Sequence, residues 1–367
     1  MAERLGIVGL PNSGKSSLFN ALTGGAAVVA SHPFTTTETS VGVARVPDPR
    51  VDRLSEMSSS KKSVYATVEL SDIAGLVAGA STGEGLGNRF LGGIREVDAI
   101  VLVLRAFESD EAPASIDPPD PMADLAVLEL ELVLADAASV EAHILKRRKA
   151  TRTAKLTGEG DPAQEVAALE KAGAALNAGT PIYRAGLSAD ERAGIASSFL
   201  LTAKPVLAVV NLGEDQLGQA EALTEPVRAE LGEGAQVLAA CVQLEAETAA
   251  LDPASRAELL EGLGLGEGAL QRVARAAYDV LGRRTFLTTG EMESRAWTFR
   301  AGAKAPECGG VIHSDLQRGF IRADIIPFEE LIEIGSWSKA RDLGKVRSEG
   351  KDYEVQDGDV LEIRFNV

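Results

Sequence analysis

Nearly continuous apolar runs alternate with stretches of helical periodicity along the first two thirds of the chain. Such runs are typical of parallel strands buried on both faces, whereas apolar residues recurring every three or four positions indicate amphipathic helices. From about residue 284 the pattern changes to short alternating strands and turns. The sequence therefore predicts an α/β domain with a mostly parallel sheet, followed by a small α+β domain. The clearest apolar runs lie at residues 5–8, 98–104, 204–210 and 236–241.

The most strongly helical stretch, residues 122–149, interrupts this alternation. Leu125, Leu128 and Leu132 repeat at helical spacing, and a second periodic stretch follows a Gly-rich break near residue 158. Two long helices joined by a polar turn indicate an α-helical hairpin, a short coiled coil, inserted into the α/β domain. The predicted parts are the first part of the α/β domain (1–121), the hairpin (122–200), the second part (201–283) and the C-terminal domain (284–367).

Residues 9–16, with the sequence GLPNSGKS, fit the pattern G-x-x-x-x-G-K-[ST] between a predicted strand and a predicted helix. A turn at a helix N-terminus gathers backbone N–H groups that bind phosphates. Lys15 is then expected to reach the β- and γ-phosphates, and the Ser16 hydroxyl to ligate Mg²⁺. The predicted nucleotide-binding residues here are Asn12, Ser13, Gly14, Lys15, Ser16 and Ser17.

Two later segments fit a nucleotide switch. A Thr-rich stretch, residues 35–37, can supply a second hydroxyl to Mg²⁺; Thr36 is the candidate, although its neighbours stay open. Asp72 and Gly75 form a D-x-x-G element after a strand predicted at residues 64–70, so the carboxylate can hold Mg²⁺ and the Gly75 N–H can sense a γ-phosphate. Leu76 follows, where Ras-like GTPases carry the glutamine that orients water, which predicts another catalytic group or slow hydrolysis.

The base-recognition segment departs from the guanine-specific pattern N-K-x-D. Here Asn211 is followed by Leu212 and, two residues later, by Glu214 in place of the aspartate. In the guanine-specific pattern, the aspartate carboxylate accepts hydrogen bonds from the N1–H and the exocyclic amine of guanine. The longer side chain of Glu214 alters that geometry. Adenine has no N1–H group, so the change does not weaken the binding of ATP. We therefore expect Asn211, Leu212 and Glu214 to lie at a base site that accepts ATP at least as well as GTP.

Composition narrows the classes of function. The chain has 367 residues, 45% hydrophobic and 25% charged, with a net charge of −17, which argues against sequence-blind nucleic-acid binding. Two cysteines, no apolar run of membrane-spanning length and no signal-peptide pattern predict a cytoplasmic protein without a membrane partner. A basic cluster at residues 146–155 is either a solvated helix face or a contact for RNA or an acidic partner.

Together the motifs resemble those of the Obg-like ATPases, the YchF family of translation-factor-class P-loop NTPases. Beyond the three nucleotide motifs, the resemblance rests on GEGLGN at residues 83–88, IREVDA at 94–99 and the C-terminal runs RAWT (295–298), RGFIRA (318–323) and EGKDY (349–353). It implies a P-loop G domain, the inserted hairpin and a β-grasp TGS domain. It also implies Mg²⁺-dependent ATP hydrolysis with some GTP binding, and association with the ribosome.

The resemblance also implies that Asn12 helps to hold a K⁺ ion, which would make Asn12 a catalytic contributor beside Lys15 and Gly75. Three positions depart from the family. Residues 106–121 hold no histidine to match a catalytic one, Thr35 replaces a redox-sensitive cysteine, and residues 37–40 differ from the usual switch sequence.

The leading hypothesis is a slow, Mg²⁺-dependent ATPase that acts as a conformational switch on the ribosome, with ribosomal RNA contacts through residues 146–155 and the TGS domain. One alternative is a ribosome or stress-factor adaptor whose nucleotide only sets its conformation. The other is an ordinary GTPase, which Leu212 and Glu214 disfavour.

Overall fold

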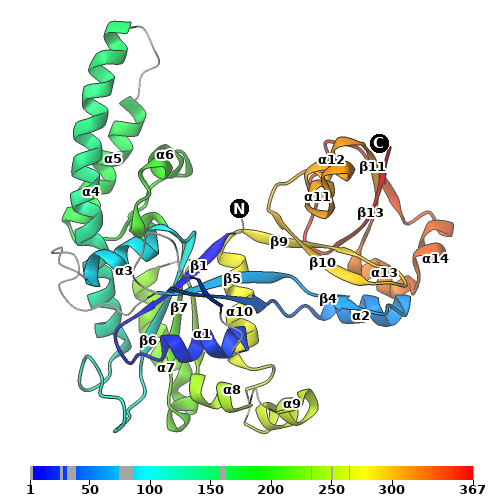
Figure 1. Cartoon of the computed structure of the whole chain (residues 1–367), viewed down its shortest axis with the longest axis horizontal. Coiled ribbons are helices and arrows are strands. Elements are labelled where there is room, and N and C mark those ends of the chain that lie inside the picture. The colour runs from blue at the N-terminus through cyan, green and yellow to red at the C-terminus, as the bar shows by residue number, and fades with distance from the viewer. Residues whose placement is uncertain are drawn as a thin grey trace. The chain divides into compact units, whose positions relative to one another are not determined.

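The computed structural model describes residues 3–24, 28–30, 39–73, 86–157, 163–232, 234–248, 251–263 and 265–366 (Figure 1). Its contacts divide the chain into two compact units, of which the first comprises residues 1–43 and 69–277 and the second residues 44–68 and 278–367. Each unit has its own β-sheet and its own hydrophobic core.

The first unit is built on a seven-stranded sheet with the order β2-β3-β5-β1-β6-β7-β8. Neighbours from β5 to β8 pair in parallel, and β2 pairs with β3 in antiparallel fashion. This confirms the predicted mostly parallel sheet. Its strands are β1 (Arg4–Gly9), β2 (Val28–Ala30), β3 (Thr39–Arg45), β5 (Thr67–Asp72), β6 (Ala99–Arg105), β7 (Val206–Asn211) and β8 (Gln236–Ala240).

Helices follow the strands and cover the sheet. Every residue of β6 is buried, as the predicted two-faced apolar run requires. One core cluster joins β1, β6 and β7 to the start of α4 and to α7. The helices are α1 (Lys15–Thr23), α3 (Leu86–Arg95), α4 (Pro121–Thr157), α5 (Ala163–Asn177), α6 (Ala189–Ile195), α7 (Ala220–Leu231), α8 (Val242–Thr248), α9 (Pro253–Gly262) and α10 (Ala269–Val280), whose last residues belong to the second unit. Single 3₁₀ turns cover Ile182–Arg184, Ala196–Ser198, Leu201–Ala203 and Glu214–Gln219.

The helical hairpin is confirmed, since α4 and α5 lie side by side (Figure 1). A separate cluster of apolar residues from α4, α5 and residues 182–200 forms its core. Buried Asp136 fixes its base, because both carboxylate oxygens accept hydrogen bonds from the backbone N–H groups of Leu201 (2.9 Å) and Thr202 (2.7 Å). Within the described ranges, no helix is both long and apolar enough to cross a membrane.

The second unit is α+β, as predicted for the C-terminal part. Its six-stranded sheet has the order β12-β11-β13-β9-β10-β4. Its strands are β4 (Ser63–Val64), β9 (Arg283–Thr288), β10 (Ser294–Arg300), β11 (Phe320–Pro327), β12 (Arg347–Glu349) and β13 (Asp359–Phe365). Its helices are α2 (Pro49–Ser58), α11 (Ala305–Ile312), α12 (Ser314–Arg318), α13 (Phe328–Ile334) and α14 (Trp337–Asp342).

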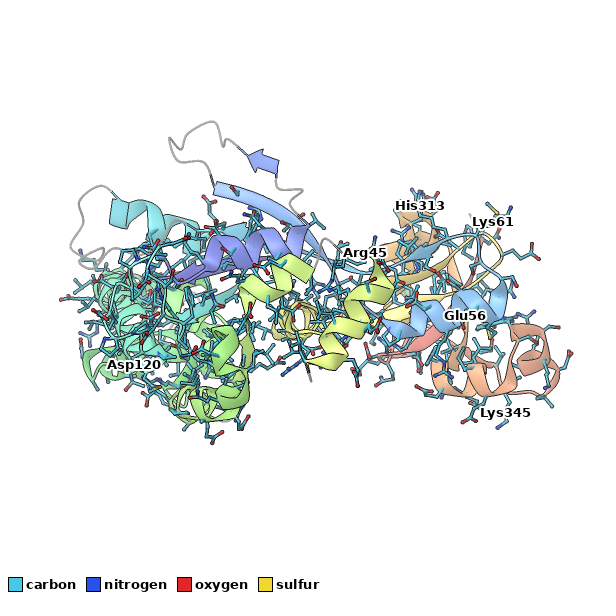
Figure 2. The ribbon with its side chains drawn as sticks, turned by 90° about the horizontal axis from the view of Figure 1, so that it is seen from below. Arg45, Glu56, Lys61, Asp120, His313 and Lys345 are labelled. Atoms are coloured by element: carbon cyan, nitrogen blue, oxygen red, sulfur yellow. The ribbon has the colours of Figure 1, made fainter. Side chains whose placement is uncertain are left out.

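Residues 44–68 belong to this second unit, although the sequence assigned them to the first part of the G domain. The predicted strand at 64–70 is two strands, and the first of them, β4, pairs with β10. Arg50 on α2 also donates to Asp357 at 2.8 Å, and Ser60 shares a hydrogen bond with Ser294 at 2.9 Å. Figure 2 accordingly shows Glu56 and Lys61 in the same unit as His313. These partners lie more than 200 residues apart in sequence, so local patterning could not reveal them.

Candidate functional site

The phosphate-binding loop, residues 9–16, lies where the predicted motif placed it, between β1 and α1. Asn12 and Gly14 both have left-handed backbone conformations, with φ values of 63° and 89°. Alternation of such conformations turns successive N–H groups toward one side and forms an anion-binding nest. The first-turn N–H groups of Lys15, Ser16 and Ser17 have no partners within the helix, so they add to the same nest.

Hydrogen bonds hold the carbonyl oxygens of this loop. Each carbonyl from residue 10 to residue 14 accepts one hydrogen bond, which turns the oxygens away. These hydrogen bonds, each written from donor to acceptor, are Ser13 N to Leu10 O (3.2 Å), Ser115 Oγ to Pro11 O (3.0 Å), Arg105 Nη1 to Asn12 O (2.9 Å), Asn211 Nδ2 to Ser13 O (3.0 Å) and Leu18 N to Gly14 O (2.9 Å). The Ser13 N–H group is used for Leu10 O, and the other N–H groups of the nest remain for phosphates.

Three predicted site residues meet at the C-terminal edge of the sheet. Lys15 Nζ donates to Ser16 Oγ at 3.1 Å, and Ser16 Oγ donates to Asp72 Oδ2 at 2.7 Å. The ammonium also forms an ion pair with Asp72 Oδ1 at 3.2 Å. A hydroxyl and a carboxylate are the hard oxygen ligands that Mg²⁺ prefers, and Asp72 Oδ1 is buried with no hydrogen bond, so these residues fit the metal that the motif implies.

Two predicted switch residues, Thr36 and Gly75, lie outside the described residues, as does Leu76. Their roles therefore stay predictions. Asp72, the last residue of β5, is the part of the D-x-x-G element that the structure describes.

The base-recognition segment begins at the end of β7. Asn211 is buried, and its amide joins two elements, since Nδ2 donates to Ser13 O and Oδ1 accepts from Val242 N at 3.2 Å. Leu212 is also buried, and its side chain packs in the core cluster of the first unit. Glu214 is exposed at the start of the 3₁₀ turn. Cys241, which follows β8, is buried, and burial raises the pKa of its thiol.

The sequence prediction missed Arg105, the last residue of β6. Its side chain is only 3% exposed and connects the phosphate-binding loop to the segment after β6. Gln216 is a second missed residue, because it accepts from Gly213 N and donates to Ala106 O, both at 2.9 Å. One signal was present in the sequence: a charged residue ending an apolar strand lies at the edge of a parallel sheet where ligands bind.

Asp124 supports Arg105 from α4, since its Oδ2 accepts the Arg105 main-chain N–H at 2.9 Å. Burial raises the pKa of Asp124 from 3.8 to about 6, and the Arg105 N–H and charge oppose that shift. Because the folded-state pKa is higher than the unfolded-state pKa, this group stabilises the folded chain below about pH 4 and loses that contribution as the pH rises through about 6.

We therefore expect Asp124→Asn to remove the pH dependence that Asp124 gives to the stability of the folded chain. The amide oxygen of the introduced asparagine can still accept the Arg105 main-chain N–H. The free energy of unfolding of the variant, measured with urea, should gain about 1–3 kcal/mol relative to the unsubstituted chain between pH 4 and pH 7. The exposed Glu141→Gln is the control and should show a constant difference. A constant difference for Asp124→Asn as well would contradict the assignment.

The basic cluster at residues 146–155 lies in the last part of α4, which ends at Thr157. Arg147 forms an ion pair with Glu165 at 2.8 Å, and Arg148 with Glu170 at 2.6 Å, so both fasten α4 to α5. Lys146 is exposed. Two of the basic residues therefore have a structural role within the hairpin, which is neither of the alternatives that the sequence offered.

Comparisons with known proteins agree with this geometry. A family model described as "50S ribosome-binding GTPase" matches residues 4–137, and one described as "YchF-GTPase_C: Protein of unknown function (DUF933)" matches residues 284–366. Proteins named "Ribosome-binding ATPase YchF" are similar over the full length of both chains, with 44% identity for that of Bacillus subtilis and 43% for that of Haemophilus influenzae.

A solved structure gives the same answer for the fold. The structure of the Schizosaccharomyces pombe YchF GTPase superposes with a TM-score of 0.84 at 33% identity, and the match covers 99% of this chain and 97% of that one. The phosphate-binding loop, the mostly parallel sheet and the inserted hairpin are therefore parts of a known architecture. The chain belongs to the YchF family.

Proposed function

We propose that this chain is a Mg²⁺-dependent ATPase that acts as a nucleotide switch on the ribosome in the cytoplasm. The observation that carries the proposal is the cluster of Lys15, Ser16 and Asp72 beside a nest of backbone N–H groups. The names of the full-length relatives support both the ATPase activity and the ribosomal partner.

Each residue of the cluster has a role in this proposal. Lys15 leaves Asp72 for the β- and γ-phosphates, and the N–H groups of residues 12–17 hold the phosphate oxygens. Ser16, Thr36 and Asp72 would hold Mg²⁺, which neutralises charge on the phosphates. Gly75 would sense the γ-phosphate. Because Leu76 cannot orient water, we expect slow hydrolysis.

Base recognition by this site should favour adenine or treat the two purines alike. The Asn211 amide nitrogen has two N–H groups, and one of them is committed to Ser13 O. The other can donate to a ring nitrogen that adenine and guanine share. Discrimination then depends on Glu214, whose extra methylene displaces the carboxylate from the geometry that guanine needs.

We expect isothermal titration to give a dissociation constant for ATP that is equal to or lower than that for GTP. Glu214→Asp, which shortens the carboxylate, should improve GTP affinity relative to ATP by several-fold. Glu221→Asp on α7, also exposed, is the control and should leave the ratio unchanged. A preference of the unsubstituted chain for GTP of tenfold or more would instead favour the ordinary GTPase.

A monovalent cation can contribute to hydrolysis through Asn12. The Asn12 Nδ2 donates to Pro113 O at 3.0 Å, which leaves the amide oxygen as the atom that can ligate K⁺. ATP turnover should therefore be lower when Na⁺ replaces K⁺. The two measurements use the same ionic strength and the same protein samples. Equal turnover would refute the role of K⁺.

Ribosomal RNA contacts are proposed for the basic cluster at residues 146–155 and for the C-terminal unit. Arg147 and Arg148 are partly neutralised by α5, so the exposed Lys146 is the described side chain best suited to contact phosphates.

A further inference from the structure

Arg105 is a buried cation whose guanidinium, among the described residues, donates its hydrogen bonds to main-chain oxygens and lies over one aromatic ring. Its Nε donates to Phe107 O at 3.0 Å, its Nη1 to Asn12 O at 2.9 Å and its Nη2 to Ala112 O at 2.7 Å. The guanidinium carbon lies 4.2 Å from the centre of the Phe107 ring. One planar group thus reaches three carbonyls in different directions, which the fixed fork of arginine permits.

In the part of the chain that the structure describes, no ion pair joins the Arg105 guanidinium directly to a carboxylate. Asp124 is the acidic residue whose charge acts on it, but the Asp124 carboxylate accepts the Arg105 main-chain N–H instead of the guanidinium. Burying a cation without a paired anion is unfavourable, and hydrophobic residues of similar volume would fill such a site at lower free energy. A role in packing alone therefore does not explain an arginine here.

The three carbonyls belong to two segments that must be held together. We call residues 106–120, between β6 and α4, the β6–α4 loop. In addition to Arg105, Asn12 Nδ2 donates to Pro113 O and Ser115 Oγ donates to Pro11 O, each at 3.0 Å. Pro11 and Asn12, which are consecutive in the phosphate-binding loop, are thus both bonded to the β6–α4 loop, and Arg105 is bonded to both loops.

The bond to Asn12 O matters most, because Asn12 has a left-handed backbone conformation. That conformation is uncommon for residues other than glycine, and although asparagine tolerates it better than most, a bond to the adjacent carbonyl helps to hold it there. The peptide plane that carries Asn12 O also carries the N–H group of Ser13. Fixing the carbonyl therefore fixes the orientation of this peptide plane at the centre of the loop, while the Asn12 side chain is held by its own bond to Pro113 O.

We propose that Arg105 is a positioning residue for ATP hydrolysis: by bonding Asn12 O and the β6–α4 loop together, it sets the phosphate-binding loop in the geometry needed at the transition state. The inference depends on the proposed ATPase activity. Groups that are pre-set before the reaction avoid reorganisation in the transition state. Loss of Arg105 should therefore lower kcat more than it raises the KM for ATP.

The test compares Arg105→Lys, which keeps a charge but cannot span three carbonyls, with Arg105→Met, which keeps an apolar stem. Phosphate release by the full-length chain should give a kcat reduced about tenfold for Arg105→Lys and about 100-fold for Arg105→Met, with KM changed less than about fivefold. Arg228→Met, a partly exposed arginine on α7, is the matched control and should leave both constants within twofold.

Hydrogen exchange followed by mass spectrometry supplies a readout that does not depend on activity. In both Arg105 variants, peptides covering residues 10–14 and 106–116 should exchange faster together, and peptides from α5 should not. A kcat within twofold of the unsubstituted chain, or equal factors of change in kcat and KM, would overturn the proposal. Absence of ATP hydrolysis by the unsubstituted chain would instead refute the proposed function.

Discussion

Replacing Lys15 by alanine should lower the rate of ATP hydrolysis by about 100- to 1000-fold, the usual effect of removing one group that stabilises charge in a transition state. Lys15 is the ammonium beside Ser16 Oγ and Asp72 in the phosphate site. Without it, the negative charge on the transferred phosphate is expected to lose the ammonium that the motif places beside it. The measurement is single-turnover phosphate release at saturating ATP and Mg²⁺.

Lys62→Ala is the control, because Lys62 is exposed and lies outside the phosphate-binding loop. It should hydrolyse ATP at the unsubstituted rate. Hydrolysis by Lys15→Ala within tenfold of that rate would place the chemistry elsewhere. A variant that loses hydrolysis and still performs the cellular role of the protein would support the adaptor alternative, in which the nucleotide only sets the conformation.

Replacing Gly14 by alanine should both destabilise the fold and weaken ATP binding. The φ of Gly14 is 89°, and a Cβ added there would lie 2.1 Å from Asn211 Nδ2. Left-handed backbone costs an alanine about 1–2 kcal/mol. The clash also displaces the Asn211 amide from Ser13 O and Val242 N, at about 1 kcal/mol for each hydrogen bond. We expect a loss of about 3 kcal/mol in the free energy of unfolding and at least about tenfold in ATP affinity.

Gly24 provides a matched control at the other end of α1. Its φ is 63°, but a Cβ there would meet no atom within 4 Å. Gly24→Ala should therefore show only the backbone strain of about 1–2 kcal/mol, with ATP affinity within twofold. Urea unfolding and isothermal titration measure the two quantities. If Gly14→Ala and Gly24→Ala lose equal amounts of unfolding free energy and of ATP affinity, the contact of residue 14 with Asn211 contributes to neither quantity.

Much of the first unit could be predicted from local patterns. The apolar runs at residues 98–104 and 204–210 correspond to β6 and β7, and the periodic stretch from residue 122 corresponds to α4. The phosphate-binding motif located Lys15 and Ser16 because its glycines and its lysine have to occur at fixed spacing. These features depend on residues close in sequence, so a single sequence contains them.

Long-range partners could not be predicted in this way. The pairing of β4 with β10 transfers residues 44–68 to the second unit, and the pattern around Val64 contains nothing that points to Arg295. Leu212 is similar: its neighbours in the sequence motif suggested a base contact, whereas its side chain packs in the core. Burial depends on which elements surround a residue, and that is a property of the whole fold.

The sequence by itself determined the α/β order of the first unit, the helical hairpin and the loop that binds phosphates, because periodicity and turn chemistry act over a few residues. Only the tertiary structure decided how that loop is held. Ser115, Arg105 and Asn211 come from three separate segments, and each turns one carbonyl of the loop away from the nest. Hydrogen bonds of a few ångströms between residues up to 198 positions apart exist only once the parallel strands have aligned their ends.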